Sequence, residues 1–434
     1  MSADTTTPLD QAATYDPLRP VAPARRVFTA RDMFALWFSL GIGLLVLQAG
    51  ALLTPALSLG AALGAILAGS VLGVVLLALA GVVGADSGLA SMAMLRPSLG
   101  VRGASVPAVI NVVQLVGWGS FEIIVMGDAA DALAKSAFGI SAPAAWTLLF
   151  GVLATTIAVL GPVSFVRRFL RAYGLWLLLA AALWLTVRLL AAYDLAELFS
   201  RPATGEMSFG GAVDLVVAMP LSWLPLIADY TRFGRSSGAM FRGSALGFFV
   251  ANVWFYALGA AYGLAAGEVS LVAALATAGS GLALLLILLD ETDNAFADIH
   301  SAAVSAATLT PGRVPLLTAG FGIVCTMIAL ALPLAQYEGF LLLIGSVFAP
   351  LFGVVLADHF LVRRRAVAAQ DIDRKGGAYW YAGGWNPAGI AAWAVGIAVF
   401  HLIAAWLPGL GSTLPALVVA GGVYVAVRRW DAGA

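Results

Sequence analysis

The chain alternates between long apolar stretches and short polar segments from residue 32 to residue 428. Each apolar stretch is close to the length of about 20 residues that a helix needs to cross a bilayer. The pattern therefore predicts an all-α polytopic membrane protein with twelve transmembrane helices. The predicted spans are residues 32–54, 59–84, 106–134, 143–162, 169–191, 211–230, 243–266, 269–306, 314–333, 337–361, 388–407 and 411–428.

The composition supports this prediction. Of the 434 residues, 61% are hydrophobic and only 11% are charged, whereas about a quarter of the residues of a soluble domain are charged. The lipid bilayer is therefore the main predicted partner, and little of the chain is left for a separate soluble domain. A formal net charge of zero gives no support to a nucleic-acid partner. The single Cys325 excludes an intramolecular disulfide, and the sequence leaves the oligomeric state unknown.

The basic residues predict how the spans are oriented. With both termini in the cytoplasm, all 23 Lys and Arg residues except Lys135, Arg188 and Arg201 fall on the cytoplasmic side, in agreement with the positive-inside rule. Residues 1–30 lack an apolar core and are predicted to be a disordered cytoplasmic tail rather than a cleaved signal. We therefore expect a multi-pass protein of the plasma or inner membrane.

Two of the predicted helices contain residues that interrupt a helix. The first has Gly-Ile-Gly at residues 41–43, and the sixth has Pro220 and Pro225. Interruptions at matching places in two halves of a membrane protein indicate an inverted-repeat transporter, because unwound backbone at this depth is tolerated only where it lines a cavity. The alternative for the glycines is close packing between helices.

The third predicted helix has a polar and aromatic face. Gln114, Trp118 and Glu122 are spaced four residues apart and therefore share one side of the helix. An aromatic face followed one turn later by a carboxylate suits a flat ring that forms hydrogen bonds. The alternative is a Trp packed against a neighbouring helix, with Glu122 paired to a basic group elsewhere.

The eighth predicted helix carries an unusual acidic string, Asp-Glu-Thr-Asp-Asn-Ala-Phe-Ala-Asp, at residues 290–298. A charge at the bilayer centre costs roughly 2.5–3.5 kcal/mol on insertion scales, and Asp290, Asn294 and Asp298 lie on one stripe. Such a stripe is expected to bind a cation, relay protons or accept hydrogen bonds from a ligand, and Thr292 adds a hydroxyl of the kind that binds sodium. The alternative is neutralisation by Arg residues elsewhere.

The end of the sixth helix offers two further groups of residues. Ser222 and Trp223 follow Pro220 and are candidates for ligand contact. Asp229 and Arg232 are three residues apart near the predicted cytoplasmic surface, where a structural pair or gate is a better interpretation than a substrate contact.

Four strings together resemble the nucleobase:cation symporter-1 (purine–cytosine permease) family, nearest its hydroxymethylpyrimidine/cytosine permease branch. They are residues 30–38 (Ala-Arg-Asp-Met-Phe-Ala-Leu-Trp-Phe), 114–118 (Gln-Leu-Val-Gly-Trp), 229–233 (Asp-Tyr-Thr-Arg-Phe) and 344–353 (Ile-Gly-Ser-Val-Phe-Ala-Pro-Leu-Phe-Gly) with the following Ala357-Asp358. The resemblance covers the first ten spans in family order.

The resemblance implies a LeuT-type fold, with two inverted five-helix repeats plus two C-terminal helices, alternating access and a planar heterocycle bound midway across the membrane. It divides the chain into a ten-helix core at 31–362, a cytoplasmic loop at 363–387 and two additional helices with a short tail at 388–434.

The resemblance also implies roles for individual residues. In the family, a Trp of the third helix stacks on the ring and a polar residue one turn later bonds to it, and Trp118 and Glu122 match these positions. The family's contact at the sixth-helix break falls here on Met219 and Pro220, which offer no aromatic ring, so Trp223 is the candidate to compensate. Carboxylates in the eighth helix, where the family usually has hydroxyls and amides, imply a ligand rich in N–H donors, such as an aminopyrimidine, or coupling to protons rather than sodium.

We therefore predict a secondary active transporter, not an enzyme, that imports a pyrimidine or other nucleobase-like heterocycle such as cytosine or hydroxymethylpyrimidine. Its coupling ion is sodium or a proton, and no other cofactor is expected. The predicted substrate-binding residues are Gln114, Trp118, Glu122, Gly41, Gly43, Met219, Ser222, Trp223, Asn294 and Asp298. The predicted coupling-ion residues are Gly41, Ile42, Asp290, Glu291, Thr292 and Asp293.

Two other functions fit less of the sequence. An amino-acid or other small-solute transporter of the same fold would bring a carboxylate close to several acidic groups, which repel it. A membrane-embedded, metal-dependent transferase would need two Asp-rich motifs on separate helices to hold magnesium on a diphosphate, and this chain has one such motif.

Overall fold

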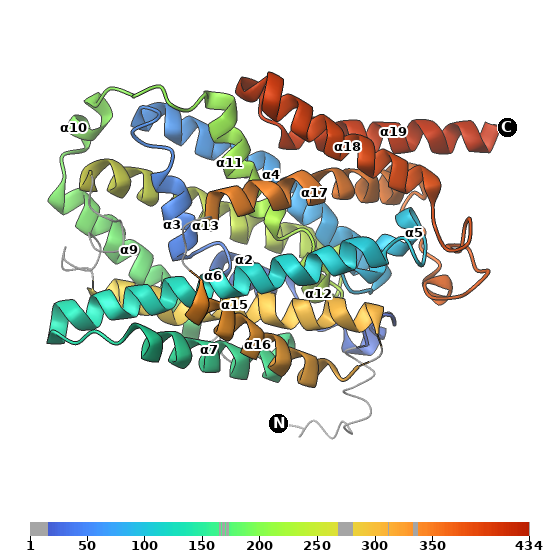
Figure 1. Cartoon of the computed structure of the whole chain (residues 1–434), viewed down its shortest axis with the longest axis horizontal. Helices are drawn as coiled ribbons and strands as arrows, with labels where there is room; N and C mark the ends of the chain where they lie inside the picture. Colours follow the sequence, from blue (N-terminus) through green and yellow to red (C-terminus); the bar gives the residue numbers. More distant parts are fainter. Residues whose placement is uncertain are drawn as a thin grey trace.

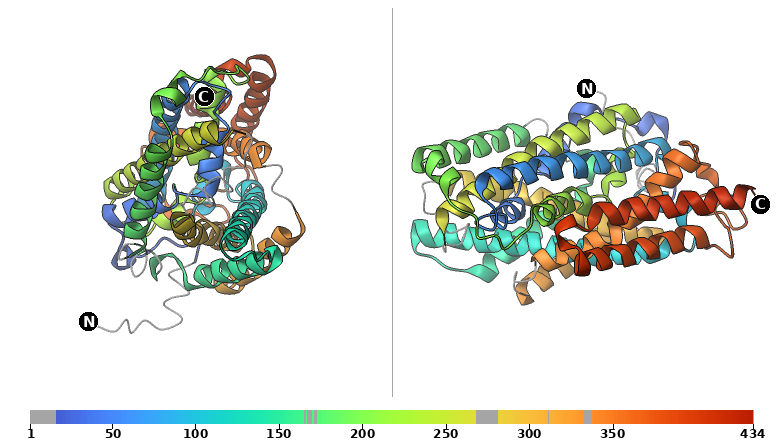
Figure 2. Two further views of the ribbon diagram at one scale, coloured as in Figure 1. Left: turned by 90° about the vertical axis from the view of Figure 1, so that its left-hand side faces the viewer. Right: turned by 90° about the horizontal axis from the view of Figure 1, so that it is seen from above.

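The computed structural model describes residues 16–164, 166, 170, 173–267, 281–310, 312–332 and 337–433. Their regular structure is helical, and the longer helices run along the long axis of the molecule (Figures 1 and 2). The helices that build the bundle are α2 (Ala30–Ser39), α3 (Leu44–Ala51), α4 (Leu59–Ser87), α5 (Arg96–Leu99), α6 (Ser105–Phe138), α7 (Pro143–Leu160), α9 (Leu175–Ala192), α10 (Leu195–Ser200), α11 (Phe209–Ser222), α12 (Ile227–Thr231), α13 (Ser237–Ala266), α15 (Gly281–Leu309), α16 (Val314–Ala331), α17 (Tyr337–Leu356) with the π-helical turn η4 (Ala357–Val362), α18 (Pro387–Trp406) and α19 (Thr413–Gly433).

The described helices confirm a protein that crosses the membrane many times. Eight of them are long and apolar enough to span a bilayer, and the bent pair α2 and α3 forms a ninth candidate. Most helix ends lie within a few residues of the predicted spans. The start of the predicted eighth span, residues 269–280, lies outside the described part of the chain. The count of twelve and the inverted repeat stay predictions.

The helices divide into a buried centre and an apolar periphery. About 61% of the most apolar stretch of α4, α6 and α13 is buried, but less than a third of that of α7, α9, α16 and α18. At the centre, α15 packs along α6, and α13 packs along α2 and α4. The exposed apolar faces of the outer helices suit contact with lipid chains.

Both predicted helix breaks are present, and the second lies at Pro225 rather than at Pro220. The bend of 60° between α2 and α3 falls on residues 40–43, as predicted. In the sixth span, α11 continues through Pro220 to Ser222, and the interruption covers residues 223–226. Pro220 lies in the last turn of α11, and its ring packs against Gly73 of α4, where a Cβ atom would come within 2.4 Å of the proline Cγ atom.

The predicted disordered tail is wrong from residue 16 onward, while residues 1–15 lie outside the described part. Val21 and Phe28 are buried, and their backbone N–H groups donate to Gly88 and Phe233, both at 2.9 Å. The segment thereby crosses the ends of α4 and α12. The composition did not predict that this segment is ordered, because isolated apolar residues in a polar segment show no helical periodicity.

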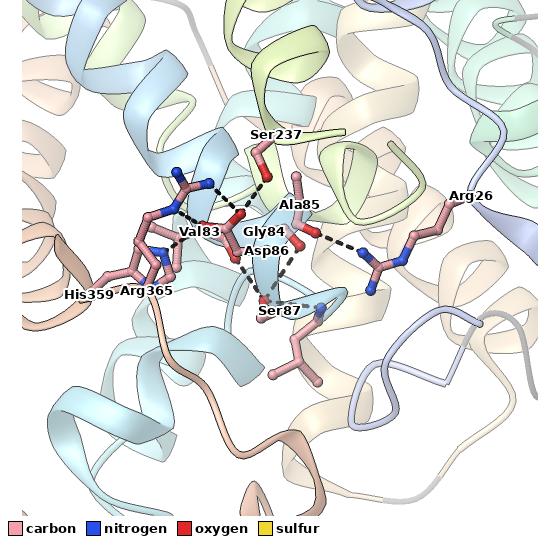
Figure 3. Close-up of polar contacts among 10 residues, drawn as sticks. Arg26, Val83, Gly84, Ala85, Asp86, Ser87, Ser237, His359 and Arg365 are labelled. Atoms are coloured by element: carbon pink, nitrogen blue, oxygen red, sulfur yellow. Dashed lines mark hydrogen bonds and ion pairs between the residues drawn. The ribbon is translucent and has the colours of Figure 1, made fainter. Parts of the chain in front are cut away.

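A polar cluster joins three elements at the same end of the bundle (Figure 3). The carboxylate of Asp86, at the end of α4, accepts hydrogen bonds from Arg365 at 2.8 and 2.7 Å and from the hydroxyl of Ser237 at the start of α13. It also lies 2.9 Å from Nε2 of His359 in η4. The hydrogen bond to Asp86 raises the pKa of the Arg365 guanidinium, so this side chain stays charged.

Candidate functional site

A tight cavity lies between the two interrupted helices and the helices α6 and α15. The space open to the centre of a water molecule is about 20 Å³, and one water needs at least about 10–15 Å³. A pyrimidine ring therefore fits only when side chains move apart. The cavity is lined by Leu40, Leu45, Val46, Trp118, Glu122, Met219, Ser222, Trp223, Glu291, Asn294 and Asp298.

On the α6 side, Trp118 is held by a chain of buried amides. Its indole Nε1 donates to Oε1 of Gln114 at 3.1 Å, and Nε2 of Gln114 donates to Oδ1 of Asn111 at 2.7 Å. Asn111 in turn donates to the hydroxyl of Ser305 in α15 at 2.8 Å. Gln114 is not among the residues that line the cavity, and its contact with a substrate stays a prediction.

An aromatic cluster covers the outer side of Trp118. The ring of Phe340, near the start of α17, lies 5.1 Å from Trp118 and 5.4 Å from Phe121 between centroids, with both pairs edge to face. No pattern in the sequence indicated Phe340, because its approach to α6 joins residues more than 200 positions apart. Trp118 is thus enclosed on one side by aromatic rings and on the other by the cavity.

The acidic string of α15 is joined directly to the break in the first span. Oε2 of Glu291 accepts the backbone N–H of Leu44 at 3.0 Å, and Nδ2 of Asn294 donates to the carbonyl oxygen of Ile42 at 3.2 Å. The hydroxyl of Ser39 donates to Oδ2 of Asp293 at 2.6 Å. The interrupted backbone is therefore satisfied by side chains of a distant helix, as unwound membrane-embedded backbone requires.

Glu122 reaches the same place from α6, where it lines the cavity close to Glu291. Both side chains are at least 95% buried. Among the described residues, no Lys, Arg or His lines the cavity. The cavity is consequently acidic, and it offers oxygen acceptors to a bound molecule.

The sixth span contributes a second aromatic wall. Trp223 lines the cavity and packs edge-on against Trp37 at 5.9 Å between centroids. The hydroxyl of Ser222 donates to the carbonyl oxygen of Met219 at 2.7 Å. Trp223 thus stands where the sequence analysis expected an aromatic residue to compensate, although its role toward a ligand stays a prediction.

Asp229 forms structural contacts. Its Oδ1 accepts the backbone N–H of Ser91 at 2.9 Å, and its own N–H donates to the hydroxyl of Ser91 at 3.2 Å. Arg232 donates to the carbonyl oxygen of Asp16 at 3.3 Å. Both residues therefore tie segments together at one end of the bundle, away from the cavity.

The remaining predicted residues lie around the cavity rather than in its lining. Gly41 packs against α13, where a Cβ atom would come within 2.8 Å of that of Ala251. Gly43, Ile42, Thr292 and Asp293 are adjacent to lining residues but are not part of the lining. The side chain of Asp290 lies outside the described part of the chain.

Oxygen atoms that suit a coupling cation gather between the first break and α15. They belong to Ser39 and Asp293, which share one hydrogen bond, and to Ile42, which accepts another from Asn294. Among the described residues, no group of three or more His, Cys, Asp or Glu side chains is placed to hold a metal ion.

The sequence analysis also missed some lining residues. Leu40, Leu45 and Val46 line the cavity because they flank the break in the first span. Their position next to Gly-Ile-Gly was the signal that would have identified them. Ser39 lies two residues before Gly41, so the same signal applied to it.

Comparisons with known proteins agree on one family. The model of the family described as permeases for cytosine/purines, uracil, thiamine and allantoin matches residues 20–425. The chain is 25% identical to the hydantoin permease of Microbacterium maritypicum, over 95% of this chain and 88% of the relative. It is 27% identical to the cytosine permease of Escherichia coli O157:H7, over 82% of this chain and 80% of the relative.

A solved structure has the same fold. It is that of Mhp1, a nucleobase-cation-symport-1 family transporter, in a closed conformation with bromovinylhydantoin bound. The TM-score is 0.84 at 23% sequence identity, and the match covers 96% of this chain and 95% of the other.

Proposed function

The chain belongs to the family of permeases for cytosine/purines, uracil, thiamine and allantoin, and we propose that it imports a pyrimidine or other nucleobase-like heterocycle by cation-coupled alternating access. The observation that carries this proposal is the cavity itself. It combines an oriented indole, Trp118, with the buried oxygen acceptors of Glu122 and Asn294 between two interrupted helices. A planar ring with N–H groups at its edge matches these surfaces.

Within this proposal, the ring stacks on Trp118 and its edge bonds to Glu122, Asn294 and Asp298. The second aromatic surface is Trp223, beside Met219 and Ser222. The tightness of the cavity suits a step of alternating access in which the site is closed around little more than a water molecule. Opening toward either side then requires the interrupted helices to move relative to α6 and α15.

We place the coupling cation, sodium or a proton, between the first break and α15. The groups proposed to hold it are the backbone at Gly41 and Ile42 and the side chains of Asp290, Glu291, Thr292 and Asp293. We further propose twelve spans in an inverted repeat, with both termini and the Asp86 cluster on the cytoplasmic side. The names of the relatives, which include hydantoin, cytosine and allantoin permeases, define the range of rings to test.

The test is uptake into proteoliposomes of labelled cytosine, uracil, hydantoin, allantoin and hydroxymethylpyrimidine. Separate arms impose a sodium gradient and a pH gradient, which identifies the coupling ion. We expect saturable uptake of at least one ring, lost in Trp118→Ala and retained in Trp406→Ala, because Trp406 is 80% exposed at the end of α18. Wild-type vesicles that take up none of these rings under either gradient would exclude the proposal.

A further inference from the structure

We infer that Glu291 is a resident carboxyl group that occupies the N-terminal end of α3 and thereby excludes rings that carry a carboxylate. This inference rests on the proposed function, because it specifies the substrate class of the same cavity. It makes Glu291 a specificity-determining residue in addition to any part it has in cation coupling.

The first observation concerns the start of α3. The residue before this helix is Gly43, which has no side chain to accept the unpaired N–H groups of the first turn. Glu291 supplies the missing acceptor from α15. Its Oε2 accepts the N–H of Leu44 at 3.0 Å.

The N-terminal end of a helix is also a place that attracts anions, because its free N–H groups and the helix dipole point outward. In transporters with interrupted helices, such ends point at the anionic group of the substrate. Here Glu291 and Leu45 both line the cavity. The position that a substrate carboxylate would take is therefore filled by the protein itself.

The second observation is that the cavity has a buried acceptor without a donor and lacks basic groups. Oδ1 of Asn294 is buried without a hydrogen-bond donor, while the carboxyl groups of Glu122 and Glu291 lie close to each other at the same place. Each of these side chains is at least 95% buried and lines the cavity. The described lining contains no Lys, Arg or His. The Asn294 oxygen is open to an N–H donor from a ligand, and a ligand carboxylate would meet acceptors instead of donors.

The backbone leaves no space for a second anion at the helix end. A Cβ atom built at Gly43 would lie 2.9 and 3.0 Å from the two carboxyl oxygens of Glu291 and 3.1 Å from Nδ2 of Asn294. The Glu291 carboxyl group is thus in van der Waals contact with the break. We conclude that the substrate is a ring without a carboxylate that presents N–H donors. This geometry also disfavours an amino-acid substrate.

The first experiment uses the wild-type full-length protein and matched pairs of rings, uracil with orotate and hydantoin with hydantoin-5-acetate. For each ring that the wild type takes up, its carboxylate-bearing counterpart is added as a competitor. We expect competition to be weaker by at least about a hundredfold, since like charges placed together are strongly unfavourable. Competition of equal strength by the carboxylate ring would overturn the inference.

The second experiment removes the Glu291 carboxyl group from the N-terminal end of α3. Purified Glu291→Ala and Glu291→Gln are heated in sodium formate or in sodium chloride of equal concentration. The formate ion can replace the missing carboxyl group in Glu291→Ala, so we expect its melting temperature to rise saturably with formate. Glu291→Gln retains an acceptor oxygen and nearly the same volume, so formate is expected to leave it and the wild type unchanged.

A folded Glu291→Ala protein that ignores formate, or a wild type that responds as strongly, contradicts the inference. If Glu291→Ala does not fold, the competition experiment still tests the inference, because it uses only the wild-type protein. Failure of the proposed function looks different, because wild-type vesicles would then take up no ring at all while the formate response of Glu291→Ala could still be measured.

Discussion

The ring of Phe340 lies directly on the backbone of Gly117, where a Cβ atom would come within 2.5 Å of the ring's Cζ atom. Gly117 precedes Trp118, and the same phenylalanine ring contacts Trp118 edge to face. The absence of a side chain at residue 117 therefore sets how far α17 approaches the wall of the cavity. A small residue on one helix thus positions an aromatic residue of another against the proposed binding surface.

We predict that Gly117→Ala impairs transport without unfolding the protein. The added methyl group displaces the end of the Phe340 side chain, and such overpacking costs about 1–3 kcal/mol, which corresponds to roughly a ten- to hundredfold weaker apparent affinity. The gain in helix propensity of up to about 1 kcal/mol offsets part of the loss of stability. The measurements are the KM of uptake and the melting temperature. The control is Gly320→Ala in α16, where nothing lies within 4 Å of the added atom, and it should change neither the KM nor the melting temperature. An equal rise of KM in both variants contradicts the prediction.

We predict that Gln114→Leu raises the KM for the transported ring by orienting Trp118 less well. The substitution removes the acceptor of the Trp118 indole and the donor to Asn111, and each buried polar group left unpaired costs about 1–3 kcal/mol. Asn252→Leu is the matched control, because it removes a similar buried bond to Ser70 away from the cavity. Both variants should melt at lower temperature, but only Gln114→Leu should raise the KM. A normal KM in Gln114→Leu would show that this chain of amides serves stability alone.

Helix geometry explains which parts of the site could be predicted from the sequence. Trp118 and Glu122 come together because residues four apart share one face of a helix, and the acidic string of α15 reaches the cavity for the same reason. The break at residues 40–43 was predictable because two glycines stand in one apolar run. These features depend on neighbours within a few turns of the same helix.

The rest depends on contacts between distant segments. The ring of Pro220 packs closely against α4 because residue 73 is a glycine, and no pattern within the sixth span encodes this contact. The bond from Ser39 to Asp293 joins residues 254 positions apart. Residues 16–28 are ordered only because the ends of α4 and α12 supply hydrogen-bond partners.

We predict that Gly43→Ala weakens both binding and stability. Residue 43 is in extended backbone that any residue adopts, so the effect is steric. The added Cβ atom meets both carboxyl oxygens of Glu291 and pushes the cap away from the N–H of Leu44, with an expected cost of about 1–3 kcal/mol. Melting temperature and uptake should both fall. Gly345→Ala in α17, where nothing lies within 4 Å, is the control, and a Gly43→Ala protein with normal uptake would show that the break tolerates displacement of Glu291.

The last prediction concerns the cluster around Asp86. Asp86→Asn removes the paired charge at Arg365 and the acceptor beside His359 (Figure 3). Arg365 is 51% exposed, so solvent screening weakens the contribution of its ion pair with Asp86 to stability. The nearly buried His359 also loses a charged partner. We expect a loss of about 1–2 kcal/mol, measured as a lower melting temperature in detergent. Asp371→Asn, whose partner Arg374 is 69% exposed at 3.3 Å, should change stability by no more than about 0.5 kcal/mol. Equal shifts in the two variants would mean that the cluster does not hold α4, α13 and η4 together.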